Sequence, residues 1–207
     1  LFRSSIAKQT MFAGGAWRWT GYMPHHKKTL ESTIAALAAC RQEDMRDVIV
    51  TSWSDDGSEA PFYTALFGVV LYAYLDYHAD YVQEEFSQYL RLYTGMGFDE
   101  WMRQGEPDLF KGCSGKNYDI TPSKYLLYQD PLGSKFLHYI KTLTTDMDAV
   151  YSNLEKAFTQ DAANACGALQ KHIAEFYALM MRALYYKWRL PLDIWEAYHN
   201  GDKQALQ

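Results

Sequence analysis

Residues 46–59 read RDVIVTSWSDDGSE and predict a strand, a polar turn and the start of a helix. The β-branched run from Val48 to Val50 is typical of a buried strand rather than of a helix. Trp53 then leads into an acidic turn that contains glycine, and Pro61 opens an apolar segment, where proline suits the first turn of a helix. In α/β folds such a turn lies at the carboxyl end of a strand, where ligands bind.

Two carboxylates, those of Asp55 and Asp56, stand beside the indole of Trp53 in this turn. An aromatic face can stack on a sugar ring, and carboxylates accept hydrogen bonds from hydroxyl groups. The stretch therefore favours a carbohydrate site. The alternative is a solvated turn with a half-buried tryptophan, and this stretch alone does not choose between the two.

A similar unit precedes this one. Residues 10–14, TMFAG, predict a short buried strand that is followed by the aromatic turn AWRWTG. A helix capped near Thr29 then runs to about Arg41, and its apolar residues recur at spacings of four and three. With a strand over 47–53 and a helix over about 60–77, the order is βαβα.

A strand, a helix and a second strand over some forty residues imply parallel pairing with a right-handed crossover. The two aromatic turns then lie at the same end of adjacent strands. This places Trp17, Trp19, Trp53, Asp55 and Asp56 around one potential mouth. Parallel sheets are normally covered on both faces and need further strands. No further strand is predicted downstream, so the sequence indicates a piece of a larger sheet. The chain also begins on Leu1, with its first methionine at Met11.

The remainder of the chain predicts helices. One covers 81–93, and a loop-rich segment over 94–122 leaves room for a short helix at 99–103. Two amphipathic stripes follow, from 137 to 158 and from 166 to 184, and a turn near 160–162 would fold them into an antiparallel pair. Pro191 interrupts the second segment. The predicted fold class is thus mainly α with a small parallel β part.

The composition narrows the classes of function. A formal net charge of -5 with no outweighing basic cluster argues against a nucleic-acid-binding protein. The three cysteines are widely spaced and form no Cys-x-x-Cys pair, which indicates reduced thiols and a cytoplasmic protein. No signal peptide, membrane span or cofactor motif is recognised. The adjacent His25 and His26 point apart and have no third ligand at metal-binding spacing, so no metal is expected.

Other polar candidates are weaker. Asp99 and Glu100 form an adjacent acidic pair, which could act in acid–base catalysis. They follow Gly97 at a predicted helix start, however, where the helix dipole stabilises negatively charged side chains. Cys113 has no evident base beside it in the sequence, so a nucleophilic role has no support.

Three segments together carry a family resemblance: MFAGGAWRWTGYMPH, LESTIAALAACR and VIVTSWSDDGSEAPFYTAL. They resemble the last quarter of the catalytic (β/α)8 barrel of family 20 glycoside hydrolases, in the bacterial exo-β-N-acetylglucosaminidase branch. The later helical part, including YKWRLPLDIWEAYHNGDKQAL, is similar to the C-terminal α-helical domain of that branch. The resemblance implies the last two βα units of a barrel over residues 1–80 and a helical domain over residues 81–207.

The resemblance also implies a role for particular residues. Trp53, with Asp55 two residues later, would line the pocket for a terminal N-acetylglucosamine or N-acetylgalactosamine, and Trp17 would form a second wall. In the wider family Glu often stands where this chain has Asp55. The family uses the acetamido oxygen of the substrate as nucleophile and the Glu of an Asp-Glu pair on the fourth strand as acid, and is an exception to the two-carboxylate scheme. That strand is not in this chain, so the chain alone is expected to be inactive, with no catalytic residue of its own.

A second hypothesis has a different class of function. The chain could be a helical interaction or scaffold domain with an incidental βαβ cap, and both strands would then be shielded by its own helices. A glycosidase piece instead leaves one strand edge bare, and such an edge favours pairing with another chain as a homodimer.

Overall fold

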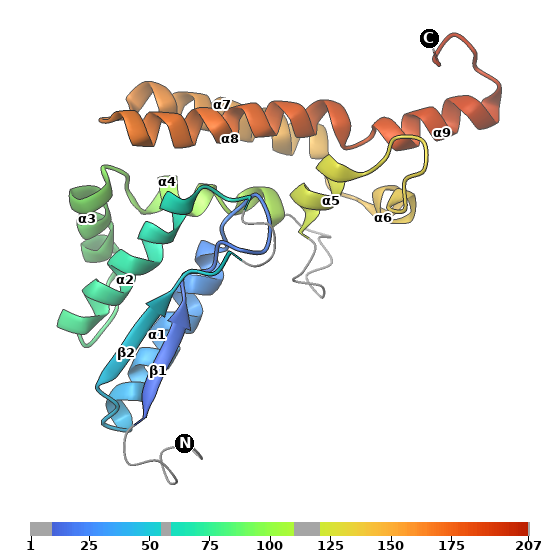
Figure 1. The fold of residues 1–207 in the computed structure, drawn as a ribbon. Coiled ribbons are helices and arrows are strands. Elements are labelled where there is room, and N and C mark those ends of the chain that lie inside the picture. Colours follow the sequence, from blue (N-terminus) through green and yellow to red (C-terminus); the bar gives the residue numbers. More distant parts are fainter. Residues whose placement is uncertain (1–9, 55–58, 110–120, 207) are drawn as a thin grey trace. The chain divides into compact units, whose positions relative to one another are not determined.

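The computed structural model describes residues 10–54, 59–109 and 121–206. This part of the chain is mainly helical and contains one two-stranded parallel sheet (Figure 1). The chain divides into two compact units, an N-terminal unit, Leu1–Gly105, and a C-terminal unit, Glu106–Gln207. None of its described helices has the length and apolar character that crossing a membrane requires.

The N-terminal unit has the predicted βαβα order. Its elements are β1 (Met11–Gly15), α1 (His26–Gln42), β2 (Asp47–Thr51), the 3-10 helix η1 (Phe62–Ala65), α2 (Leu66–Tyr77), α3 (Gln83–Thr94) and α4 (Phe98–Arg103). The two strands pair in parallel, from Met11 opposite Asp47 to Gly15 opposite Thr51, which confirms the predicted pairing. Helix α1 begins before Thr29, because the side chain of His25 accepts the backbone N–H of Lys28 and caps the helix.

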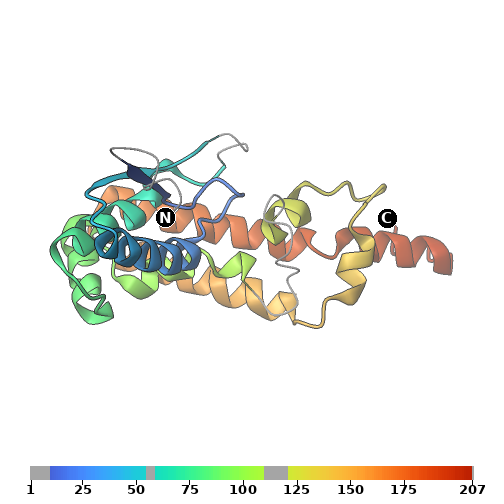
Figure 2. The ribbon, with the colours of Figure 1, turned by 90° about the horizontal axis from the view of Figure 1, so that it is seen from below.

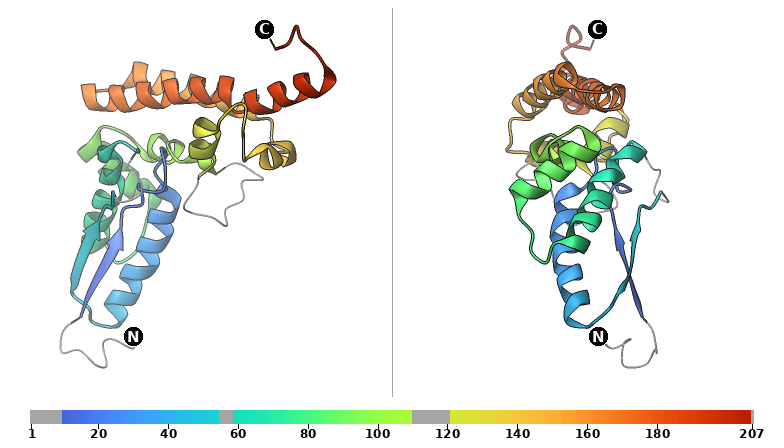
Figure 3. Two further views of the ribbon diagram at one scale, coloured as in Figure 1. Left: turned by 45° about the vertical axis from the view of Figure 1, so that its right-hand side comes forward. Right: turned by 90° about the vertical axis from the view of Figure 1, so that its left-hand side faces the viewer.

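The helices of this unit lie on one side of the sheet, as the right-hand view of Figure 3 shows. Phe12 and Val50 face these helices and pack against their apolar core. Within the described residues nothing covers the other face, where Met11 is 59% and Ile49 46% exposed. Ile49 is exposed on this open face, and Val48, on the same side as Val50, is still 38% exposed. The predicted strand is confirmed, but its predicted burial is wrong for Val48 and Ile49. Dimerisation through the bare strand edge stays a prediction.

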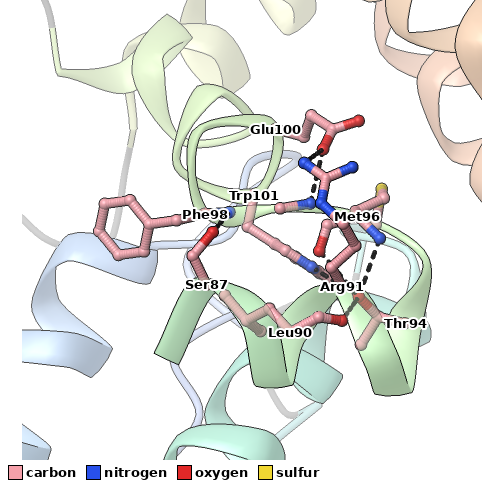
Figure 4. A network of polar contacts seen from close by, with 9 residues as sticks. Ser87, Leu90, Arg91, Thr94, Met96, Phe98, Glu100 and Trp101 are labelled. Atoms are coloured by element: carbon pink, nitrogen blue, oxygen red, sulfur yellow. Dashed lines mark hydrogen bonds and ion pairs between the residues drawn. The ribbon is translucent and has the colours of Figure 1, made fainter. Parts of the chain in front are cut away.

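A polar network fixes the corner between α3 and α4 (Figure 4). The left-handed Gly95 ends α3, and the carboxylate of Glu100 accepts the backbone N–H of Gly97 at 2.5 Å. Arg91 reaches the same carboxylate at 3.3 Å, and the buried indole of Trp101 donates to Thr94. Glu100 therefore has the structural role that its position at a helix start predicted.

His26 lies completely inside this unit. Its ring centroid lies 4.5 Å from that of Phe67 with the planes tilted by 35°, and it meets Trp101 edge-on at 5.4 Å. Its Nε2 lies 3.4 Å from the side-chain oxygen of Gln104. Burial lowers the pKa of His26 to about 3, because a charged imidazolium would lose its hydration there. His26 is thus a neutral core residue that ties the start of α1 to α4.

The C-terminal unit is helical throughout its described part. Its elements are the 3-10 helix η2 (Glu106–Asp108), α5 (Pro122–Tyr128), α6 (Leu137–Thr142), α7 (Met147–Asn164), α8 (Ala168–Lys187) and α9 (Leu190–Asn200). Helices α7 and α8 lie side by side along their length (Figures 1 and 2), and the buried rings of Phe158 and Tyr177 meet between them at 5.3 Å. The predicted antiparallel pair is confirmed.

Three details of this unit differ from the sequence prediction. The turn between the long helices lies at 165–167 rather than near 160–162, because α7 continues to Asn164 and Gly167 caps α8. The stripe predicted from Leu137 is broken after Thr142, because Asp146 starts a new helix by accepting the backbone N–H of Ala149. Helix α5 was not predicted.

The boundary between the compact units does not coincide with the predicted boundary after residue 80. Helices α3 and α4 contact α2 and α1, so they belong to the N-terminal unit. The assignment of residues 1–80 and 81–207 to two domains of the family stays a prediction, since contacts alone do not define family domains.

A half-buried aspartate joins η2 to α5 in the C-terminal unit. Asp108 accepts the backbone N–H of Ser123 at 2.7 Å and its hydroxyl at 3.0 Å, at the start of α5. Burial raises the pKa of Asp108 to about 6, although the hydrogen bonds from Ser123 act in the opposite direction. Burial, with Asp108 as a further cause, also raises the pKa of Tyr177 on α8.

We expect the C-terminal unit to be more stable at low pH, where the Asp108 carboxyl group is protonated. Its pKa is raised in the folded state, so the stabilisation is complete below the unfolded value near 3.8 and is lost as the pH rises through about 6. The free energy of unfolding should fall by roughly 2 to 3 kcal/mol from pH 4 to pH 7 relative to Asp108→Asn. Urea unfolding followed at the Trp188 indole resonance measures this. The exposed Asp202→Asn is the control, and equal pH profiles for wild type and Asp108→Asn would contradict the prediction.

The N-terminal unit should respond to pH in the opposite direction. The pKa of His26 is lowered, so the unfolded chain binds a proton between about pH 6.5 and about pH 3 that the folded chain does not. Lowering the pH from 7 to 5 should cost about 2 kcal/mol of unfolding free energy through His26, and His26→Phe should remove this part of the loss. The Trp101 indole resonance reports this unfolding, and the exposed His172→Phe should behave as wild type. A wild-type profile in His26→Phe would refute the role of His26.

Candidate functional site

Three indoles gather at the carboxyl end of the sheet. Trp17 and Trp19 come from the turn after β1, and Trp53 follows β2. The ring centroids of Trp17 and Trp19 are 4.4 Å apart with planes inclined by 28°, and those of Trp19 and Trp53 are 6.0 Å apart at 29°. We call these three residues the tryptophan column. The parallel pairing of the strands brings the two turns together, as the sequence predicted.

The column starts on a lysine of α1. The Lys28 ammonium lies 3.4 Å from the ring centroid of Trp17, in the geometry of a cation–π contact. Lys28 and Trp19 cannot share one face of this ring without overlapping, so they cover opposite faces. Both contacts take up surface of the Trp17 ring, which is half-buried, whereas Trp53 is 54% exposed. Of the two predicted sugar walls, Trp53 is the one with open indole surface.

The first aromatic turn is anchored to the start of α1. The backbone N–H of Trp17 donates to the hydroxyl of Thr29 at 2.9 Å, and its carbonyl accepts the N–H of His25 at 2.7 Å. Gly15 makes room for the column, because a Cβ there would lie 2.6 Å from the Trp19 ring. These contacts fix the position of Trp17 and Trp19 above the strand end.

The second aromatic turn is tied to the sheet by its own tryptophan. Trp53 Nε1 donates to the hydroxyl of Thr51 at 3.0 Å, and that hydroxyl donates to the carbonyl of Gly14 at 3.0 Å. The indole is thus held by one edge over the junction of β1 and β2 and stacks on Trp19, and the residue is still 54% exposed.

The acidic part of the predicted site cannot be placed in the same way. Asp55 and Asp56 lie outside the described residues, as does Cys113. Of the histidine pair, His26 is in the core and His25 caps α1. Among the residues that the structure describes, no three His, Cys, Asp or Glu side chains are grouped as metal ligands would be.

The sequence analysis did not predict a role for two basic residues at this end of the sheet, Lys28 and Arg18. Lys28 carries no local signal, because its contact with Trp17 depends on where α1 starts. Arg18 does carry a local signal in the sequence. In an extended turn alternate side chains point to opposite sides, so a residue between two partly exposed tryptophans points inward. The structure places Arg18 in the interior, where it is 1% exposed.

A comparison with protein families identifies the C-terminal part of the chain. The family model described as the Glycoside Hydrolase 20C C-terminal domain matches residues 99–207, which is slightly more than half of the chain. None of the curated proteins compared with the chain matches it. The resemblance to family 20 that the sequence suggested is confirmed at the level of the family. This chain belongs to the glycoside hydrolase 20C family and carries its C-terminal domain.

Proposed function

We propose that the chain is part of a glycosidase that removes terminal β-linked N-acetylhexosamine. The observation that carries the proposal is Trp53, a half-exposed indole at the carboxyl end of a parallel strand, in a member of a glycoside hydrolase family. In this proposal Trp53 stacks on the apolar face of the terminal sugar, and Asp55 accepts hydrogen bonds from its hydroxyls. Trp17 supports the platform from within the column.

The column gives Trp53 the properties of a good platform. It is held by the Thr51 hydroxyl at its nitrogen and contacts Trp19, so little side-chain freedom is left to lose when a sugar binds. The Lys28 ammonium at the far end lies on Trp17 and leaves the outer surface of Trp53 open. A rigid aromatic surface beside a polar turn suits the amphipathic faces of a pyranose.

The proposed reaction is the substrate-assisted, retaining mechanism of family 20. The acetamido oxygen of the sugar attacks its own anomeric carbon while a glutamic acid protonates the departing glycosidic oxygen. Water then opens the cyclic intermediate with the same residue acting as base, and the configuration is retained. We assign the acid to an Asp-Glu pair on a barrel strand outside this chain, so the chain supplies sugar contacts and no acid.

The scaffold hypothesis is less well supported. It requires the chain's own helices to shield both strands, whereas one face of the described sheet is open and bears Met11, Ala13 and Ile49. It also offers no reason for a stack of three indoles at the ligand-binding end of parallel strands. Both features fit a piece of a larger barrel.

Titration with the methyl β-glycoside of N-acetylglucosamine should shift the indole N–H resonance of Trp53 in the NMR spectrum. The Trp195 resonance should stay in place, because this similarly exposed tryptophan lies in the C-terminal unit, under the Lys141 ammonium. Trp53→Ala should weaken binding at least about tenfold through the loss of stacking, and Trp195→Ala should not. Equal shifts at both indoles, or none at Trp53, would contradict the proposed platform.

The 207-residue chain should release no aglycone from an aryl N-acetyl-β-glucosaminide. The reason is that the proposed acid is absent, so no group protonates the leaving oxygen. A colorimetric assay over the pH range 4 to 8 measures this, with a complete family 20 enzyme as positive control. Turnover that Asp55→Asn or Glu100→Gln abolishes would mean that the chain has its own acid.

A further inference from the structure

Arg18 points away from its two tryptophan neighbours and links the two aromatic turns. Its Nε donates to the hydroxyl of Ser52 at 2.9 Å, and its Nη2 donates to the hydroxyl of Ser54 at 2.6 Å. Its Nη1 donates to the carbonyl of Ala60 at 3.2 Å, just before η1. One guanidinium from the first turn thus binds three points of the segment that follows β2.

The two serines are the residues directly before and after Trp53. Bonds to both of them fix the segment on either side of the indole, while Thr51 holds the indole nitrogen. The ring of Phe62 lies 4.9 Å from the guanidinium carbon and closes the other side of the group. The position of Trp53 is therefore set by Arg18 as well as by its own strand.

A buried guanidinium is costly, because it gives up its hydration on folding. The same burial lowers the pKa of Arg18, although an arginine keeps its charge at neutral pH. An apolar side chain would fill the space at lower cost, so the charge is there for the directed bonds that it makes. A planar fork of donors can serve three acceptors at fixed angles, which a lysine ammonium cannot reproduce.

We propose that Arg18 is a positioning residue for the sugar platform, acting through Ser52 and Ser54 to hold Trp53 in its binding orientation. The role in sugar binding rests on the proposed function. We call the three bonds from Arg18 to Ser52, Ser54 and Ala60 the Arg18 clamp. That this clamp sets the orientation of the Trp53 indole is a separate claim, and the two claims can be tested apart.

The test compares Arg18→Lys, which keeps the charge but not the fork, with Ser54→Ala, which removes one acceptor from an exposed residue. Both should move the Trp53 indole resonance in sugar-free samples and weaken binding of the methyl glycoside about tenfold. The melting temperature of Ser54→Ala should stay within about 2 °C of wild type, since surface changes have small effects on stability. If Arg18→Lys does not fold, Ser54→Ala by itself still tests whether the Arg18 bonds position Trp53. Arg46 is an exposed arginine just before β2, so Arg46→Lys is the matched control and should change none of these readings.

The outcomes separate the two claims. A Trp53 resonance and a sugar affinity that stay unchanged in Arg18→Lys and Ser54→Ala would overturn the role of Arg18 and leave the proposed function standing. Loss of affinity in proportion to a lower melting temperature would make Arg18 a purely structural residue and would equally overturn it. A wild-type chain that binds no sugar would overturn the proposed function and the role of Arg18 in sugar binding. The Trp53 indole resonance of the variants without sugar would still show whether Arg18 sets the orientation of Trp53.

Discussion

The parallel pairing of β1 with β2 is the constraint on which the candidate site depends. A parallel pair needs a crossover, and α1 supplies it. Both turns that leave the strands then emerge at one end of the sheet, so residues some 34 positions apart in the chain become neighbours. The tryptophan column and the Arg18 clamp are two consequences of this arrangement, one on the exposed side of the turns and one beneath them.

The column and the clamp divide the work between apolar and charged contacts. The stacked indoles gain from ring–ring and cation–π attraction, and they keep one aromatic surface exposed at Trp53. The Arg18 guanidinium loses its hydration and forms directed hydrogen bonds with Ser52 and Ser54 beneath that surface. Under the proposed function, the exposure of Trp53 leaves ring surface for the sugar, and the bonds of Arg18 to Ser52 and Ser54 hold the segment that carries the ring.

Much of the fold follows from local patterns in the sequence. The order of the strands and helices up to Arg103 and the antiparallel pair of α7 and α8 come from β-branched runs and from apolar spacings of three and four. Helix boundaries were less predictable, because they depend on single caps: the imidazole of His25 extends α1 and the carboxylate of Asp146 divides the stripe that begins at Leu137. The exposure of Val48 and Ile49 could not be predicted from residue type, since a β-branched strand is buried only where neighbouring elements cover it.

The sequence by itself determined which residues could form the site: two aromatic turns, each following a strand, with Trp53 beside acids. It did so because alternation and turn composition are local properties that chain neighbours reveal. Only the tertiary structure decided that Trp17 contacts both Lys28 and Trp19, that Trp53 is more than half exposed, and that Arg18 joins the turns. These are contacts between segments distant in the chain, and their geometry depends on how strand ends and helix starts meet in space.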